Sequence, residues 1–265
     1  MNSSVEADPT QKVQATRIDK AQRRTVDESV VRTAILTIYV NGSEIVSLVC
    51  TPTDLEPLVA GFLVSEGFLT SRDELESITF VKGKTCVADV TTSSSVRTSG
   101  TRMLVTSGCG AGATFARFLE QVGEGEPLPD ATFRASDIVE RMRELGRSAP
   151  VFRETGGAHT AALIAQDKLT YVMEDVGRHN ALDKVIGAAF LDDVEVAGLG
   201  LASSGRLSAD AVCKALARRI PLLVSRAAPT SMAVEAARRA GLTLVGFARG
   251  NRMNVYSGEE RIITD

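Results

Sequence analysis

Only one of the chain's 4 cysteines, Cys109, lies in a setting that suggests chemistry. It follows a strand-like run, Met103 to Thr106, and is surrounded by Gly108, Gly110 and Gly112. Glycines let a backbone take unusual φ and ψ angles and turn several N–H groups toward one point. Such donors, with a helix N-terminus behind them, lower the pKa of a cysteine and make its thiolate more available. The loop could therefore hold a thiolate or a persulfide, and the alternative is a buried structural cysteine beside a tight turn.

The other three cysteines, Cys50, Cys86 and Cys213, lie in apolar strand or helix contexts, where a small buried hydrophobe is expected. No CxxC or other metal-ligand spacing connects the four. The sequence therefore predicts free thiols, with no disulfide framework and no metal held by the protein.

Two histidines are the candidates for proton transfer near neutral pH. His159 follows paired glycines at the start of a predicted strand, and His179 lies in the motif Glu174 to Asn180, after two carboxylates and a glycine turn. Each could equally be a hydrogen-bonded structural histidine. No feature of the sequence selects among His159, His179 and Asp175 for a role in orienting the cysteine loop or moving protons.

Basic residues recur in three turns at predicted strand ends, residues 203–208, 225–231 and 247–252. They contribute Arg206, Arg226, Arg249 and Arg252. Guanidinium groups match phosphate geometry, and helices that begin beside such turns favour anions. Although no Walker A or GxGxxG pattern occurs, the convergence of the turns predicts a pocket for a nucleotide or pyrophosphate.

The elements that must position these residues are a β-rich first part and an alternating second part. Asn41-Gly42 predicts a hairpin between Ala34–Val40 and 44–50, followed by a helix that Thr53 or Asp54 could cap. Further strands are predicted at 78–81, 86–91 and 103–106, and a crossover helix at 136–145. From His159 onward strands and helices alternate, which predicts a mostly parallel sheet that binds ligands beyond the carboxyl ends of its strands.

The expected organisation is a flexible polar tail over residues 1–25 and one domain over residues 26–265. Within the domain, a β-rich subdomain covers about 26–130 and an α/β subdomain about 131–265. A net charge of −3 argues against a nucleic-acid partner. The sequence shows neither a signal peptide nor an apolar run of the ~20 residues that cross a bilayer, which predicts a cytoplasmic protein with no membrane partner.

Several long blocks, in order, resemble the FdhD/NarQ family of formate dehydrogenase accessory sulfurtransferases. They cover nearly everything after the tail and read TPTDLEPLVAGFLVSEGFL, TSGCGAGA, TGGAHTAAL, EDVGRHNALDKVIG, SGRLSADAVCKA, LVSRAAPTS and LVGFARGNRMNVYSG. The resemblance implies an α/β fold, a cytidine-deaminase-like three-layer sandwich with a mixed, largely parallel sheet, preceded by an antiparallel N-terminal subdomain. It also implies a homodimer without the deaminase zinc, and this chain indeed lacks the H-x-E and P-C-x-x-C pattern of that site.

The resemblance implies that Cys109 takes sulfur from a cysteine desulfurase as a persulfide. The sulfur would pass to a bound substrate, the molybdenum bis(molybdopterin guanine dinucleotide) cofactor, before the catalytic subunit of formate dehydrogenase receives it. By the same resemblance, the segment that binds this guanine nucleotide comprises Phe247, Ala248, Arg249, Gly250, Asn251 and Arg252. Arg206 and Arg226 are candidate additions to it.

One position departs from the family pattern, because many relatives carry a second cysteine where this chain has Gly112. A single cysteine remains sufficient for transfer, since a persulfide can be attacked at its outer sulfur and release the thiolate. The departure keeps two alternatives open. One is a chaperone that binds and delivers the cofactor without catalysis, and the other is a cysteine hydrolase that uses Cys109 with a histidine.

Overall fold

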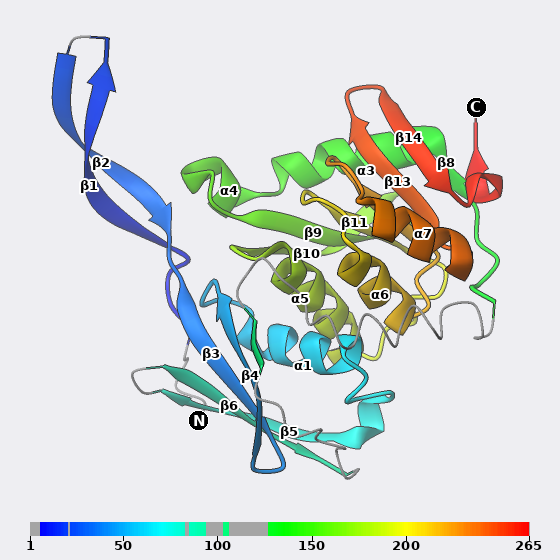
Figure 1. The fold of residues 1–265 in the computed structure, drawn as a ribbon, viewed down its shortest axis with the longest axis horizontal. Coiled ribbons are helices and arrows are strands. Elements are labelled where there is room, and N and C mark those ends of the chain that lie inside the picture. The colour runs from blue at the N-terminus through cyan, green and yellow to red at the C-terminus, as the bar shows by residue number, and fades with distance from the viewer. Residues whose placement is uncertain (1–5, 21, 83–84, 94–102, 106–126, 265) are drawn as a thin grey trace.

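A six-stranded sheet lies at the centre of the molecule (Figure 1). The computed structural model describes residues 6–20, 22–82, 85–93, 103–105 and 127–264. The order of the strands across this sheet is β10-β9-β11-β12-β13-β14. Their bounds are β9 (His159–Ala165), β10 (Lys168–Asp175), β11 (Gly200–Ser203), β12 (Leu222–Ser225), β13 (Thr243–Arg249) and β14 (Arg252–Ser257).

This sheet is mixed, as expected, but the prediction that it is largely parallel is wrong. β11, β12 and β13 are parallel neighbours, whereas β9 is antiparallel to both β10 and β11, and β14 is antiparallel to β13. Two short turns explain two of the three antiparallel pairs, β9 with β10 and β13 with β14. Gln166, with φ 50°, and Gly250, with φ 64°, begin two-residue connections after β9 and β13, and connections of that length join only antiparallel strands.

Helices cover both faces of the sheet and produce three layers (Figure 1). Along each strand, alternate residues face opposite clusters: Leu201 and Leu223 pack in the core that contains α5, while Ala202 and Val224 pack against α3. One face is covered by α5 (Arg178–Leu191), α6 (Ala209–Ala217) and α7 (Ser231–Ala240), and the other by α3 (Ala135–Arg147). The short helix α4 (Pro150–Thr155) follows α3.

A second, five-stranded sheet has the order β5-β6-β3-β4-β7. Its strands are β3 (Ala34–Val40), β4 (Ser43–Cys50), β5 (Leu75–Lys82), β6 (Cys86–Thr92) and β7 (Met103–Val105). The predicted β3–β4 hairpin is confirmed, with positive φ angles of 48° at Asn41 and 79° at Gly42. The sheet is mixed rather than antiparallel, because β3 pairs with β6 and β4 with β7 in parallel. Long connections, both of which contain the same helix, allow these parallel pairs.

That helix, α1 (Leu55–Ser65), connects the two halves of the molecule by packing along α5. The two helices approach so closely that a Cβ added at Gly61 would lie 1.8 Å from the carbonyl oxygen of Asp183. A Cβ at Gly187 would lie 1.9 Å from the carbonyl oxygen of Pro57. Only glycine permits this contact. One hydrophobic core is continuous from β3 and β4 through α1 and α5 to the six-stranded sheet.

A two-stranded ribbon of β1 (Thr10–Asp19) and β2 (Gln22–Val31) projects from the body (Figure 1). It pairs in register from Thr10 with Val31 to Asp19 with Gln22, so strands occupy much of the stretch where the sequence predicted a flexible tail. The prediction missed them because most of their side chains are exposed and give no hydrophobic period.

The remaining elements are short: η1 (Arg72–Glu74), η2 (Glu259–Arg261), and the strand pair β8 (Phe133–Arg134) with β15 (Ile262–Ile263). In the part of the chain described, no helix combines the length and the apolar character needed to cross a membrane.

Candidate functional site

The basic turns predicted from the sequence emerge along one edge of the six-stranded sheet. Pairing of Ser203 with Ser225, and of Val224 with Val245, aligns the carboxyl ends of β11, β12 and β13. β9 is antiparallel to β11, so its first residue, His159, lies at this same edge. The turns are also bonded to each other, because the amide of Thr230 donates to the carbonyl of Leu207 at 2.9 Å. The structure therefore brings Arg206, Arg226 and Arg249 to neighbouring positions on one edge.

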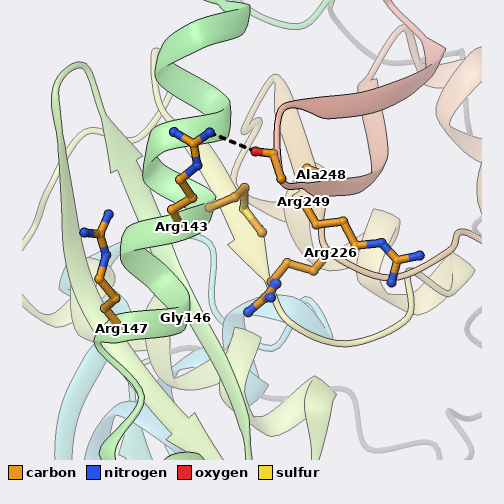
Figure 2. A pocket seen from close by; sticks show the side chains of 8 residues that line it. Arg143, Gly146, Arg147, Arg226, Ala248 and Arg249 are labelled. Carbon is orange, nitrogen blue, oxygen red and sulfur yellow. Dashed lines mark hydrogen bonds between the residues drawn. The ribbon is translucent and has the colours of Figure 1, made fainter.

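A cavity of about 400 Å³ lies at this edge on the α3 side of the sheet (Figure 2). We call it the arginine cavity, because four of its lining residues are arginines that come from α3 and from the ends of β12 and β13. Its volume is in the range of small-molecule sites. The lining residues are Met142, Arg143, Gly146, Arg147, Arg226, Ala248, Arg249 and Gly250.

A break in β13 brings its end to the cavity. The pairing of β13 with β14 shifts register between Gly246 and Arg249, and Phe247 within this stretch has a φ of 52°. A positive φ at a bulky residue is strained and persists only where surrounding contacts hold it. Here the amide of Phe247 donates to the carbonyl of Ala227 at 3.0 Å. The ring of Phe247 then supports Arg249, whose guanidinium carbon lies 5.7 Å from the ring centroid.

The second wall of the cavity comes from α3, and sequence reasoning missed it. Arg143 donates to the carbonyl of Gly250 at 3.1 Å and to the side chain of Asn251. Glu140 pairs with Arg143 at 3.0 Å and with Arg147 at 2.9 Å. A charged stripe at helical spacing is typical of a solvated face, which concealed the role of these residues. The signal that could have revealed it is Gly146, a glycine inside a helix without a capping function.

The predicted binding residues fall into two groups. Arg226, Ala248, Arg249 and Gly250 line the cavity. The other four do not line it. Phe247 supports Arg249, and the Asn251 side chain accepts a hydrogen bond from Arg143. Arg206 and Arg252 are exposed and lie in the same basic turns as the lining residues or in the neighbouring one.

Cys109 lies outside the residues that the structure describes, as do Gly108, Gly110 and Gly112. The described chain before it is β7, which pairs in parallel with β4 and ends at Val105 opposite Leu48.

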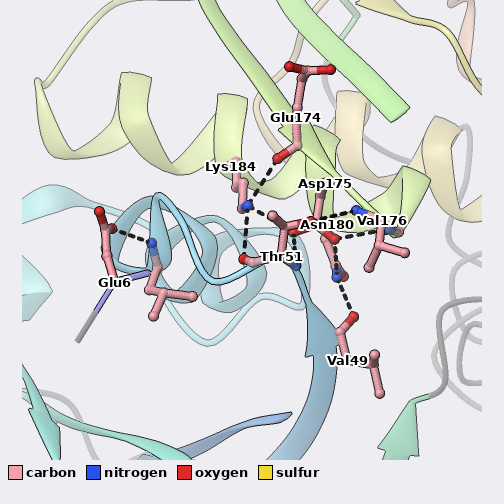
Figure 3. A network of polar contacts seen from close by, with 10 residues as sticks. Glu6, Val49, Thr51, Glu174, Asp175, Val176, Asn180 and Lys184 are labelled. Carbon is pink, nitrogen blue, oxygen red and sulfur yellow. Dashed lines mark hydrogen bonds and ion pairs between the residues drawn. The ribbon is translucent and has the colours of Figure 1, made fainter. Parts of the chain in front are cut away.

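Asp175 lies in a buried network on the α1–α5 side of the same edge (Figure 3). Its Oδ1 accepts from the amide of Gly177 at 2.8 Å and from the side chain of Asn180 at 2.9 Å. Its Oδ2 accepts from the amide of Thr51 at 2.9 Å and pairs with Nζ of Lys184 at 2.8 Å. Asp175 and Lys184 are both 0% exposed. A carboxylate whose two oxygens each have two donors is a structural connection between the halves of the molecule and not a free base.

Glu174, the neighbouring carboxylate, caps a helix. Its two oxygens accept from the amides of Val151 and Phe152, each at 2.9 Å, at the start of α4. Those amides have no partner within their own helix, so the carboxylate satisfies two donors that the helix start leaves unpaired.

The two histidines differ in their surroundings. Nε2 of His179 lies 2.8 Å from Oγ of Ser208, the residue that caps α6. Burial, with nearby Lys214, lowers the pKa of His179 to about 3, so this ring is neutral near pH 7 and is a poor base. Burial and the adjacent Arg178 also lower the pKa of His159. His159 lies next to Gly205, where an added Cβ would be 3.4 Å from Nδ1 of the ring.

The cysteines that the structure describes match their expected structural role. Burial raises the pKa of Cys50 to about 12 and that of Cys213 to about 12, so both are protonated thiols at neutral pH. Cys86 is half-buried.

Comparison with known proteins gives a consistent result. The model of the FdhD/NarQ family matches residues 31–263. A sulfur carrier protein FdhD from Bacillus licheniformis is 38% identical over 230 residues, which cover 86% of this chain and 87% of that protein. The protein of the same name from Methanothermobacter thermautotrophicus is 38% identical over 251 residues, covering 95% of this chain and 98% of that one.

A solved structure extends the similarity to the fold. It is the crystal structure of a formate dehydrogenase accessory protein from Desulfotalea psychrophila, which superposes with a TM-score of 0.82 at 29% sequence identity. The match covers 97% of this chain and 100% of that chain.

Proposed function

The chain belongs to the FdhD/NarQ family, and from that premise we propose that it carries sulfur in the maturation of formate dehydrogenase. In this proposal Cys109 receives sulfur from a cysteine desulfurase as a persulfide. It then passes the sulfur to a bound substrate, the molybdenum bis(molybdopterin guanine dinucleotide) cofactor, which goes on to the catalytic subunit of formate dehydrogenase. The sulfur-carrier role is supported by relatives that are named sulfur carrier proteins and that match this chain over 87% and 98% of their own length.

The observation that carries the second part is the arginine cavity. Its four guanidinium groups come from α3 and from the ends of β12 and β13, at the ligand-binding edge of an α/β sheet. The proposed substrate contains guanine dinucleotides, whose diphosphates suit guanidinium forks. Arg226 and Arg249 would contact these phosphates, and Phe247, Asn251, Arg252 and Arg206 would complete the segment that holds the nucleotide.

The transfer of sulfur balances without an added oxidant or reductant. The Cys109 thiolate attacks the outer sulfur of the desulfurase persulfide, the S–S bond of the donor breaks, and the donor leaves as a thiolate. Cys109 is then the persulfide, and attack by the acceptor on its outer sulfur regenerates the Cys109 thiolate. Gly112 stands where many relatives carry a second cysteine, so this protein would carry out both steps with one cysteine.

Of the candidate groups for moving protons, His159 suits that role best. Both oxygens of Asp175 are already occupied by donors, and His179 has a pKa of about 3. His159 lies half-buried at the same sheet edge as the basic turns. A homodimer and a cytidine-deaminase-like fold remain predictions from the family resemblance, and a cytoplasmic location remains a prediction from the sequence pattern.

Mass spectrometry of the purified protein tests the role of Cys109. After incubation with a cysteine desulfurase and cysteine, Cys109 should gain the mass of one sulfur atom. Cys109→Ser should abolish this gain and the activation of formate dehydrogenase, whereas Cys213→Ser, which removes a thiol with a pKa of about 12, should keep both. Full activation by the Cys109→Ser variant would overturn the proposal.

A second function is favoured by the same cavity together with Gly112: a chaperone that binds and delivers the cofactor without transferring sulfur. It predicts the opposite pattern in the activation assay. Cys109→Ser would keep full function, while Arg249→Ala would lose it.

A further inference from the structure

The arginine cavity carries more positive charge than its own carboxylates neutralise. Four guanidinium groups line it. Within the described part of the chain, the only carboxylate that pairs with any of them is Glu140, at 3.0 Å from Arg143 and 2.9 Å from Arg147. Arg226 and Arg249 make no ion pair with a described residue. A cavity with uncompensated guanidinium groups favours an anion that carries more than one charge.

The cavity is shaped around one of these groups. Gly146 lies in the last turn of α3, where a glycine weakens a helix relative to alanine. A Cβ at this position would lie 2.7 Å from Nη1 of Arg226. Gly146 therefore provides the space in which the Arg226 guanidinium lies against α3, as Figure 2 shows. This contact brings Arg226, from the end of β12, close to the wall that α3 contributes.

Glu140 is placed so that it can be exchanged. Its side chain is 42% exposed, and those of Arg143 and Arg147 are 44% and 69% exposed. Ion pairs between exposed side chains contribute little stability. A phosphate oxygen that enters the cavity can replace the carboxylate at both guanidinium groups and form stronger bidentate contacts there.

We propose that Arg143 and Arg147 of α3 form a further wall of this phosphate site, in addition to Arg226 and Arg249, and that the diphosphate displaces Glu140 from both α3 arginines. The inference rests on the proposed function, because the guanine dinucleotide substrate supplies the diphosphate. It adds a wall of the site that the sequence did not reveal, and a carboxylate that competes with the ligand and so restrains binding.

Calorimetric titration of the full-length protein with guanosine diphosphate tests the proposal, with inorganic pyrophosphate as competitor and guanosine as the base-only probe. Arg147 is the cleanest position, since its side chain contacts Glu140, whereas Arg143 also holds the Gly250 carbonyl. Arg147→Ala should weaken binding about tenfold, the typical effect of losing a charged hydrogen-bond pair. Glu140→Gln should tighten binding roughly two- to fivefold, because the competing ion pair is gone.

A matched pair of controls exists on α7, where Glu235 and Arg239 form an exposed ion pair at 2.6 Å outside the cavity. Glu235→Gln and Arg239→Ala should leave the affinity unchanged. Unchanged binding by both Arg147→Ala and Glu140→Gln overturns the α3 wall, and if Arg226→Ala still weakens binding, the proposed function stands. Absence of binding to wild-type protein also overturns the inference, while persulfide formation on Cys109 reports separately on sulfur transfer.

Discussion

The Asp175–Lys184 network and the arginine cavity lie at the same edge of the six-stranded sheet, on its opposite faces. They differ in whether their charged side chains are buried and paired. In the network both ionic side chains are 0% exposed, and the carboxylate has a donor for each of its acceptor positions. In the cavity Arg226 and Arg249 are exposed and have no ion pair with a described residue. The first arrangement holds the molecule together, and the second is suited to receive a ligand.

This difference shows that the composition of a charged motif does not predict whether the motif is structural or binds a ligand. The segment Glu174 to Asn180 combines carboxylates, a glycine turn and basic residues, and the sequence offered its Asp175 and His179 as candidates for orienting the cysteine loop or moving protons. Its carboxylates instead cap α4 and connect β4 to α5. Glu140, Arg143 and Arg147 have a spacing that is typical of a solvated helix face, yet the two arginines line the cavity.

The largest effect is expected from breaking the buried pair. Lys184→Ala leaves the Asp175 carboxylate buried without its cation, which should lower the free energy of unfolding by about 3–5 kcal/mol. Urea denaturation measures it. A loss below about 1 kcal/mol would mean that the interior tolerates an unpaired charge and that the contrast between the two regions fails.

Arg226→Ala tests the other side of the comparison. The free energy of unfolding should change by no more than about 0.5 kcal/mol, since the side chain is exposed. The affinity for guanosine diphosphate should fall about tenfold, or about 1.4 kcal/mol. If stability falls while affinity is kept, Arg226 belongs with the structural residues.

Measuring the free energy of unfolding over a pH series tests whether the buried His179 stays uncharged in the folded protein. The pKa of His179 is about 3 in the folded protein and about 6.5 when unfolded. Between these pH values the unfolded chain binds a proton at this histidine that the folded protein does not bind. The stability that the neutral His179 contributes is therefore fully present above pH 6.5 and is lost as the pH falls toward 3. Its slope is at most about 1.4 kcal/mol per pH unit. His179→Asn should remove this slope, and equal slopes in both proteins would contradict a neutral buried His179.

The smallest effect is expected at Gly146, where one substitution should raise stability and weaken binding. Gly146→Ala should stabilise α3 by about 0.5–1 kcal/mol, because the group that the new Cβ meets, 2.7 Å away, is the flexible end of Arg226. Displacing that guanidinium should weaken guanosine diphosphate binding severalfold. Thermal unfolding and calorimetry measure the two effects, and tighter binding would show that Gly146 does not position Arg226.

Local signals were enough to predict much of the fold. Asn41-Gly42 predicted the β3–β4 hairpin, and the alternation of apolar runs predicted α5, α6, α7 and the strands between them. Strand order and direction were not predictable in the same way, since β9 joins β11 in antiparallel fashion across 34 intervening residues, from 166 to 199, that the local pattern does not constrain. β14 was not predicted, and only its first residue, Arg252, belongs to the predicted binding segment, residues 247–252.

The candidate site was predictable where residues lie in turns at strand ends, as with Arg226 and Arg249. It was not predictable where the site depends on contacts between distant segments. The approach of Gly146 to Arg226, and of Arg143 to Gly250, arises only when α3 packs on the sheet. The roles of Asp175 and His179 likewise depend on Thr51 and Ser208, which are far from them in sequence.

The close contact of α1 with α5 also bears on how the protein folds. Gly61 and Gly187 leave no space for a side chain between the two helix backbones, and one core runs through both halves. Neither half can bury its apolar face without the other, so we expect a single cooperative unfolding transition, with no stable intermediate in which one sheet persists alone. The β-rich and α/β subdomains are in that sense one folding unit, and a fragment that ends near residue 130 should not fold independently.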